Sequence, residues 1–141
     1  MNQEGVSGFE DQDCKTTAEF IQLHNDLLDV LNSKKLNDPG YKQARTEKNA
    51  LQTTQLFEKI RSMYDSLEAK VPHDKTKELV QKKILRTKRF TGFLGILTAM
   101  AGVERMIGYM STKKLKLSFL CCYKLVQDHL EIFFNAVRLD F

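Results

Sequence analysis

The clearest pattern in the chain predicts an amphipathic helix over residues 125–138. Its apolar side chains recur at helical spacing and form one stripe: Val126, Leu130, Phe133, Phe134 and Val137. The opposite stripe is polar and carries two carboxylates three residues apart, Asp128 and Glu131. Positions three apart share one side of a helix, so both acids are expected on the side away from the aromatic stripe.

Two further segments predict helices in the first half of the chain. Thr16 and Glu19 have the spacing of a capping box, and the apolar row that follows predicts a helix over residues 17–32. Helical periodicity resumes over residues 50–67, and Pro72 is expected to stop it.

The remaining segments are less regular. The pattern over residues 76–85 predicts a helix less clearly than the segments above. Residues 115–123 fit either a strand or a helix, and we expect a helix because the rest of the chain is mostly helical. Residues 90–103 are an uncharged apolar run that predicts a buried core helix, because a bilayer needs about 20 residues. His24 has no ligand partner one turn away, which indicates a structural role.

The composition is that of a globular protein, with 42% hydrophobic and 28% charged residues among 141. Wholesale disorder is therefore excluded, although the chain need not fold well alone. Three cysteines, two of them adjacent, indicate a reducing compartment rather than a disulfide framework. The first fourteen residues are polar and acidic, so no signal peptide is expected.

The net charge of +4 hides an uneven distribution, since residues 1–70 carry −3 and residues 71–141 carry +7. The excess lies in two basic runs: Lys82, Lys83, Arg86, Lys88 and Arg89, then Lys113, Lys114 and Lys116. Clustered cations bind phosphate backbones by releasing counterions, without reading sequence. A solvated helix end and a lysine-rich loop explain the two runs equally well, so both interpretations stay open.

Asp128 and Glu131 also allow two interpretations. Acids in the first turn of a helix complement the helix dipole, which is the ordinary role and the one that the pattern alone favours. Carboxylates held rigidly on one face can instead bind a metal ion.

A longer similarity changes this balance. Residues 123–138, YKLVQDHLEIFFNAVR, resemble the YKLSQDHLELFF signature of P-element-type DNA transposases, which include the THAP domain-containing transposases. Residues 17–33 resemble the segment that closes the GTP-binding insertion domain of that family. Residues 89–96, RFTGFLGI, resemble the stretch that opens the C-terminal part of its RNase H-like catalytic domain. The three blocks stand in the family's order.

The resemblance implies a fold and a division of the chain. The fold class is mainly α, namely the helical C-terminal portion of an RNase H-like transposase catalytic domain, without most of its sheet. The implied division is a flexible leader at 1–15, the end of the GTP-binding insertion domain at 16–33, a linker at 34–48, and the C-terminal helical part of the RNase H-like domain at 49–141.

The resemblance also implies chemistry and partners. Three acids hold divalent metal ions in this family for DNA strand cleavage and transfer; Glu131 matches the third, and Asp128 is a neighbour that would support it. Magnesium is the implied metal, GTP the nucleotide of the full-length protein, transposon-end DNA the substrate and the nucleus the location. The upstream half of the transposase is an implied partner, a homo-oligomer is left open, and no membrane association is expected.

Two departures from the family pattern bear on activity. Val126 stands where the family has serine, and the chain stops at Phe141 where the family continues. The two upstream aspartates are absent and one acid cannot hold a metal pair, so the chain alone is expected to be inactive. The alternative is a truncated or domesticated helical interaction module, in which Glu131 is a surface acid.

Overall fold

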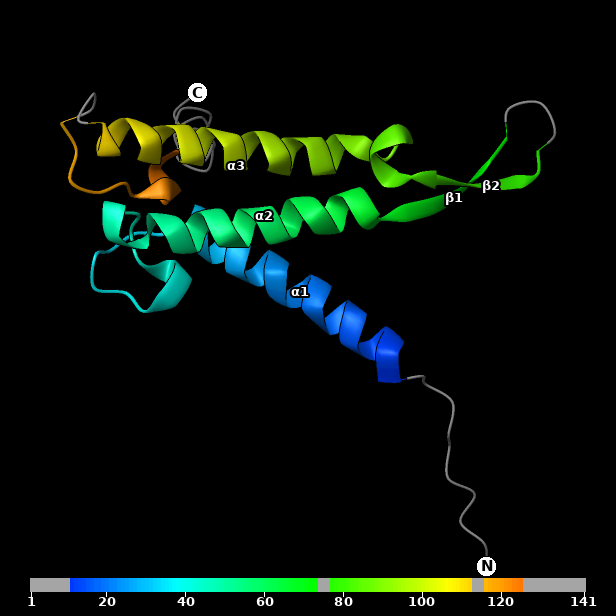
Figure 1. Ribbon diagram of the computed structural model, residues 1–141, viewed down its shortest axis with the longest axis horizontal. Coiled ribbons are helices and arrows are strands. Elements are labelled where there is room, and N and C mark those ends of the chain that lie inside the picture. Colours follow the sequence, from blue (N-terminus) through cyan, green and yellow to red (C-terminus); the bar gives the residue numbers. More distant parts are fainter. Residues whose placement is uncertain (1–10, 74–76, 113–115, 126–141) are drawn as a thin grey trace, which may run out of the picture.

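In the described part of the chain, three α-helices form the body, and a two-stranded hairpin extends from one end (Figure 1). The computed structural model describes residues 11–73, 77–112 and 116–125. The elements are α1 (Asp11–Leu31), α2 (Ala50–Ser66), β1 (Glu68–Pro72), β2 (Leu79–Lys83) and α3 (Phe90–Ser111), with 3-10 turns η1 (Gly40–Lys42), η2 (Glu47–Asn49), η3 (Ile84–Arg86) and η4 (Cys122–Leu125). The prediction of a mainly α fold is confirmed.

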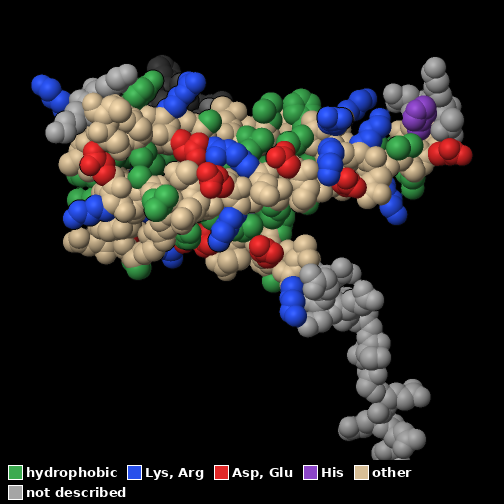
Figure 2. Space-filling view, viewed as in Figure 1, with side chains coloured by type: hydrophobic (Ala, Val, Ile, Leu, Met, Phe, Trp, Pro, Cys, Tyr) green, Lys and Arg blue, Asp and Glu red, His purple; other side chains and the backbone are tan. Residues whose placement is uncertain are grey.

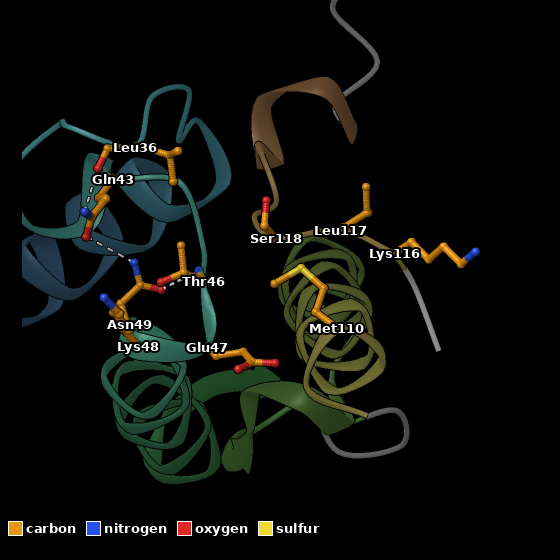
Figure 3. Close-up of a pocket in the computed structure, with 10 residues that line it drawn as sticks. All are labelled: Leu36, Gln43, Thr46, Glu47, Lys48, Asn49, Met110, Lys116, Leu117 and Ser118. Atoms are coloured by element: carbon orange, nitrogen blue, oxygen red, sulfur yellow. Dashed lines mark hydrogen bonds between the residues drawn. The ribbon is translucent and has the colours of Figure 1, made fainter. Parts of the chain in front are cut away.

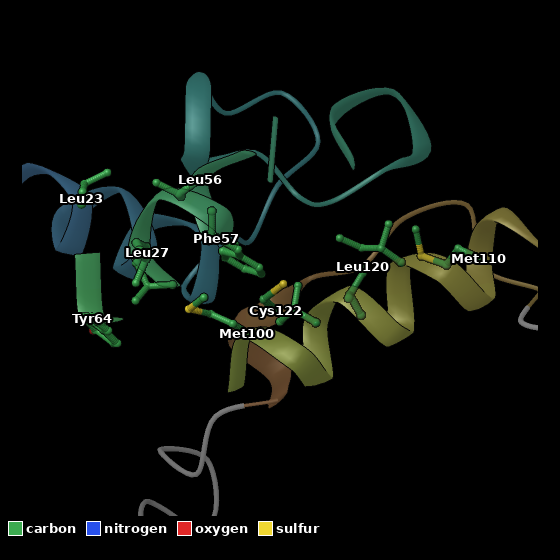
Figure 4. Packing of buried hydrophobic residues seen from close by; sticks show 13 residues of the cluster. Leu23, Leu27, Leu56, Phe57, Tyr64, Met100, Met110, Leu120 and Cys122 are labelled. Carbon is green, nitrogen blue, oxygen red and sulfur yellow. The ribbon is translucent and has the colours of Figure 1, made fainter. Parts of the chain in front are cut away.

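The core lies where apolar stripes of the three helices meet, and α2 is the central helix because it packs against both others (Figure 4). Each stripe repeats every three or four residues, so its side chains fall on one face. The buried cluster consists of Leu23, Leu27, Val30, Leu56, Phe57, Ile60, Tyr64, Met100, Val103, Ile107, Met110, Leu120 and Cys122. Burying one large aliphatic or aromatic side chain stabilises a fold by about 1.5–3 kcal/mol.

The helix predicted over residues 17–32 is confirmed, but it begins earlier. α1 starts at Asp11, so Thr16 and Glu19 lie inside the helix and do not cap it. No glycine or proline stands between residues 11 and 16 to interrupt the helix. The helical conformation therefore extends into the predicted leader.

The helix predicted over residues 50–67 is also confirmed, and its end has a different cause from the one expected. α2 ends at Ser66, whose hydroxyl donates a hydrogen bond to the Met63 carbonyl (2.7 Å). Leu67 is already extended, and Pro72 closes β1 instead of α2.

The helix predicted over residues 76–85 is wrong. β2 occupies this stretch and pairs antiparallel with β1, so that Glu68 lies opposite Lys83 and Val71 opposite Val80. β-Branched residues favour strands and pair well across them, and this cross-strand contact outweighs the weak helical periodicity.

The core helix predicted over residues 90–103 is confirmed as a helix, but it is longer and less buried than expected. α3 continues to Ser111 and turns Met100 and Val103 toward the core. On the outside, Phe90 is 40% exposed and Leu94 is 49% exposed. One face of α3 is therefore not covered by the described residues.

Among the described residues, α3 is long enough and apolar enough to cross a membrane. Length and composition are weak evidence, because core helices of soluble proteins meet the same two criteria. It carries Glu104 and Arg105 within its length. The guanidinium of Arg61 on α2 forms a two-point ion pair with the Glu104 carboxylate, one arm of which is 3.1 Å long. This pair and the apolar stripe join α3 to α2.

The helix favoured over residues 115–123 is wrong as well. Leu120 instead pairs with Arg45 through two backbone hydrogen bonds of 2.9 and 2.8 Å. This long-range pairing competes with a local helix and places Leu120 and Cys122 in the core. The helix predicted over residues 125–138 lies outside the described residues, except for Leu125 in η4.

Candidate functional site

The first basic run lies on the surface where the hairpin joins α3. Its five cations are exposed: Lys82, Lys83, Arg86, Lys88 and Arg89. Ile84 and Thr87, which alternate with them, are buried. The Thr87 hydroxyl donates to the Ile84 carbonyl (2.7 Å) and accepts from the Arg89 backbone N–H (3.2 Å). This anchored turn directs the charges to solvent, and Figure 2 shows Lys and Arg side chains gathered at the junction.

The pairing of the hairpin separates two neighbouring lysines. Side chains alternate along a strand, so Lys83 shares a face with Glu68, with which it forms an ion pair of 2.9 Å. Lys82 lies across from Ala69 on the other face. A shallow cavity of about 430 Å³ follows the edge of the hairpin base and is lined by Glu68, Gln81, Lys82, Lys83 and Arg86.

The second basic run is remote from the first. Lys113 and Lys114 lie outside the described residues, whereas Lys116 is exposed and follows the end of α3. The first run precedes the start of α3, and a helix of 22 residues is about 33 Å long. Lys116 therefore lies far from the five cations of the first basic run.

A larger groove, of about 950 Å³, lies between the start of α2 and the end of α3 (Figure 3). It is lined by Leu36, Gln43, Thr46, Glu47, Lys48, Asn49, Met110, Lys116, Leu117 and Ser118. The Asn49 amide donates to the Gln43 side chain (3.2 Å) and accepts from the Thr46 backbone N–H (2.8 Å). These polar groups already form hydrogen bonds with one another. The side of the groove that they line is therefore better explained by a structural role than by catalysis.

Arg45 is a structural hub that the sequence did not reveal. Its buried guanidinium donates to the Tyr41 carbonyl (2.9 Å), to the Gln43 carbonyl and to the Thr53 hydroxyl (3.1 Å). Burial lowers the pKa of the Arg45 guanidinium. Since its donors are used inside the fold, Arg45 is not available for DNA phosphates. It ties the loop around η1 to α2.

His24 has the structural role predicted for it. Its Nδ1 donates to the Phe20 carbonyl (2.7 Å), which leaves Nε2 to accept from the Tyr64 hydroxyl (2.7 Å). Burial raises the pKa of Tyr64 to about 12. The pair links α1 to α2.

Cys14, Cys121 and Cys122 are free thiols. Burial raises the pKa of the Cys122 thiol, which keeps it protonated and unreactive. The Cys121 thiol donates to the Lys34 carbonyl (3.0 Å). Both cysteines near the end of the described chain therefore serve packing.

The predicted metal-binding acids cannot be placed in this geometry. Glu131 and Asp128 lie outside the described residues. Within residues 11–73, 77–112 and 116–125, no three His, Cys, Asp or Glu side chains lie close enough together to hold a metal ion.

Comparison with known proteins gives two significant matches. Residues 1–44 match the family profile described as the TNP-like, GTP-binding insertion domain. Over 128 residues, 90% of the chain, the sequence is 27% identical to the human DNA transposase THAP9. In both comparisons the chain is similar to transposases of the P-element type. It spans 13% of the length of this relative, and no solved structure matches the chain significantly.

The match to the insertion-domain profile runs to residue 44, whereas the sequence predicts that this domain ends at residue 33. It includes α1 and the loop around η1, and ends at Ala44, next to Arg45. α1 packs against α2, and Arg45 bonds to Thr53 on α2. The segment that matches the insertion-domain profile thus shares one core with α2.

Proposed function

We propose that this chain is the C-terminal part of a P-element-like DNA transposase, in which it contributes the third metal-binding acid for metal-dependent DNA strand cleavage and transfer. The observation that carries the proposal is the block YKLVQDHLEIFFNAVR at residues 123–138. It occurs in a chain that is similar over 90% of its length to a human DNA transposase.

Glu131 is the residue that we propose binds the metal. Hard carboxylate oxygens suit magnesium, and the two other acids of the set would come from the upstream half. Two magnesium ions, when bound, supply activation of the attacking hydroxyl and stabilisation of the leaving oxygen. Asp128, one turn earlier in the predicted helix, would support Glu131 or replace it.

The upstream half of the transposase is the partner that we propose for the open face of α3. Phe90 and Leu94 expose large apolar surfaces there. A Cβ atom added at Gly95 or Gly102 would meet nothing within 4 Å, so space is free beside the small residues too. Apolar surface of this kind is normally covered. The chain spans 13% of its relative's length, which leaves ample protein to cover it.

The same proposal implies that the full-length protein binds DNA and GTP. The patch of Lys82, Lys83, Arg86, Lys88 and Arg89 would neutralise phosphates near the cleavage site. Lys113, Lys114 and Lys116 would form a separate contact. We expect GTP to need the part of the insertion domain that precedes this chain, because the sequence has no glycine-rich phosphate loop.

A reconstituted nuclease tests the proposal. The chain is co-expressed with the upstream half of its transposase, and cleavage of transposon-end DNA is measured with and without magnesium. We expect magnesium-dependent cleavage that Glu131→Gln abolishes and that Asp128→Asn reduces less. Glu19→Gln, an exposed acid on α1, is the matched control and keeps full activity.

The opposite result would be as informative. Cleavage that survives Glu131→Gln would contradict the assignment of the third acid. A complex that forms but never cleaves would favour the helical interaction module, in which Glu131 is a surface acid. Nuclear location is part of the proposal and is checked by imaging a tagged chain together with its upstream half.

A further inference from the structure

The hairpin extends beyond the helices and pairs only with itself among the described residues (Figure 1). Every residue of β2 is exposed, and β1 alternates between exposed and half-buried positions. An isolated two-stranded hairpin is marginally stable in water. Its projection from the body therefore points to a partner that it contacts.

The two faces of the hairpin differ in chemistry. One face carries the cross-strand pairs Val71 with Val80 and Ala69 with Lys82. The other carries Glu68 opposite Lys83 at the base, Lys70 opposite Gln81 in the middle, and Pro72 opposite Leu79 at the far end. The Glu68–Lys83 ion pair fixes the base of this second face, which we call the polar face. Lys70 and Gln81 lie at its centre and are exposed.

The segment that follows the hairpin is basic. No acidic residue occurs between Glu78 and Glu104, a stretch that includes β2, η3 and the start of α3. Arg86, Lys88 and Arg89 follow directly from the hairpin and are exposed beside it. The cavity at the base joins Gln81 and Arg86 in one surface. The hairpin and its base thus offer a polar ribbon flanked by cations.

The dimensions fit duplex DNA. Paired strands lie about 4.8 Å apart, and a five-residue strand is about 17 Å long. The major groove of B-form DNA is about 12 Å wide and admits a two-stranded ribbon. A glutamine can pair with adenine and a lysine with guanine at base edges in that groove, while the flanking cations meet phosphates.

We propose that the β1–β2 hairpin binds duplex DNA as a ribbon in the major groove, with Lys70 and Gln81 directed at base edges and with Arg86, Lys88 and Arg89 on the flanking phosphates. This inference rests on the proposed DNA-binding function and adds a groove contact that the basic run alone does not require.

The test combines affinity with a groove-specific probe. Binding of the 141-residue chain to a fluorescent mixed-sequence duplex of about two helical turns is followed by anisotropy at several salt concentrations. Dimethyl sulfate then reports access to guanine N7, which lies in the major groove. The variants are Lys70→Ala with Gln81→Ala, Arg86→Ala with Arg89→Ala, and the control Lys59→Ala on α2.

We expect the chain to protect guanine N7, and the Lys70/Gln81 variant to lose this protection with about tenfold weaker binding. The Arg86/Arg89 variant should lower the slope of log affinity against log salt by about 2. Lys59→Ala should change neither quantity, and circular dichroism should be the same for all variants.

Two results would overturn the groove contact while the phosphate contact stands. One is salt-dependent binding without N7 protection, and the other is protection that survives in the Lys70/Gln81 variant. If the duplex is not bound at all, or if the Arg86/Arg89 variant binds as tightly as the unaltered chain, the proposed DNA role of the basic run fails as well.

Discussion

α2 and α3 lie side by side, yet the fold uses them differently. α2 buries Phe57 and Ile60 completely between its two neighbours. α3 has the more apolar sequence but leaves Phe90 and Leu94 40% and 49% exposed. Within the described residues, the more apolar helix is therefore not the more buried one. A face of α3 that the described residues leave uncovered is what we expect if the chain is, as we propose, a region of a larger transposase.

The largest effect is expected at the centre of α2. Phe57→Ala should lower the free energy of unfolding by about 3–5 kcal/mol, because it removes a fully buried ring from the core. Leu94→Ala, which truncates an exposed apolar side chain of α3, should lower it by less than about 0.5 kcal/mol. Urea unfolding followed by circular dichroism measures both. Similar losses at the two positions would mean that the α3 face is covered within this chain.

Arg45→Met should have the next largest effect. The change leaves buried carbonyls of the η1 loop and the Thr53 hydroxyl without their donor, at a cost of about 3 kcal/mol. The same unfolding assay measures it, with Lys42→Met, an exposed cation in η1, as the control. A neutral result would contradict the role of Arg45 as the joint between the loop and α2.

The raised pKa of Tyr64 predicts that the free energy of unfolding falls at alkaline pH. Its pKa is about 12 in the fold and about 10 in an unfolded chain, so the fold favours the neutral hydroxyl. This contribution is complete below pH 10 and is lost as pH rises from 10 to 12, by about 2–3 kcal/mol. Unfolding of the chain and of Tyr64→Phe across this range tests it. The variant should lack this decline, and equal declines in both proteins would contradict the prediction.

The smallest effect on the free energy of unfolding is expected from the Arg61–Glu104 ion pair between α2 and α3. Arg61→Ala should cost less than about 1 kcal/mol, because the Arg61 and Glu104 side chains are 36% and 28% exposed and water screens them. The cost should shrink further at high salt. Unfolding at two salt concentrations measures it. A larger loss that salt does not change would mean that this pair, more than apolar packing, holds α3 to α2.

The sequence predicted α1, α2 and α3 because their apolar positions repeat at helical spacing over many residues. It failed where distant contacts decide the conformation. β2 needs β1 as a partner, and Leu120 needs Arg45. The burial of Arg45 could not be predicted either, since the carbonyls that hold it come together only when the η1 loop folds. The basic patch was visible as a run of charges, but the separation of Lys82 from Lys83 required the register.

Hydrogen exchange tests the central claim most directly, namely that this chain is a region of a larger transposase that covers α3. Backbone amides of Phe90–Ser111 are compared in the chain alone and in its complex with the upstream half of its transposase. The account predicts that exchange around Phe90 and Leu94 slows strongly in the complex, while exchange around Phe57 changes little. Unchanged exchange at Phe90 and Leu94 in a complex that has formed would contradict it.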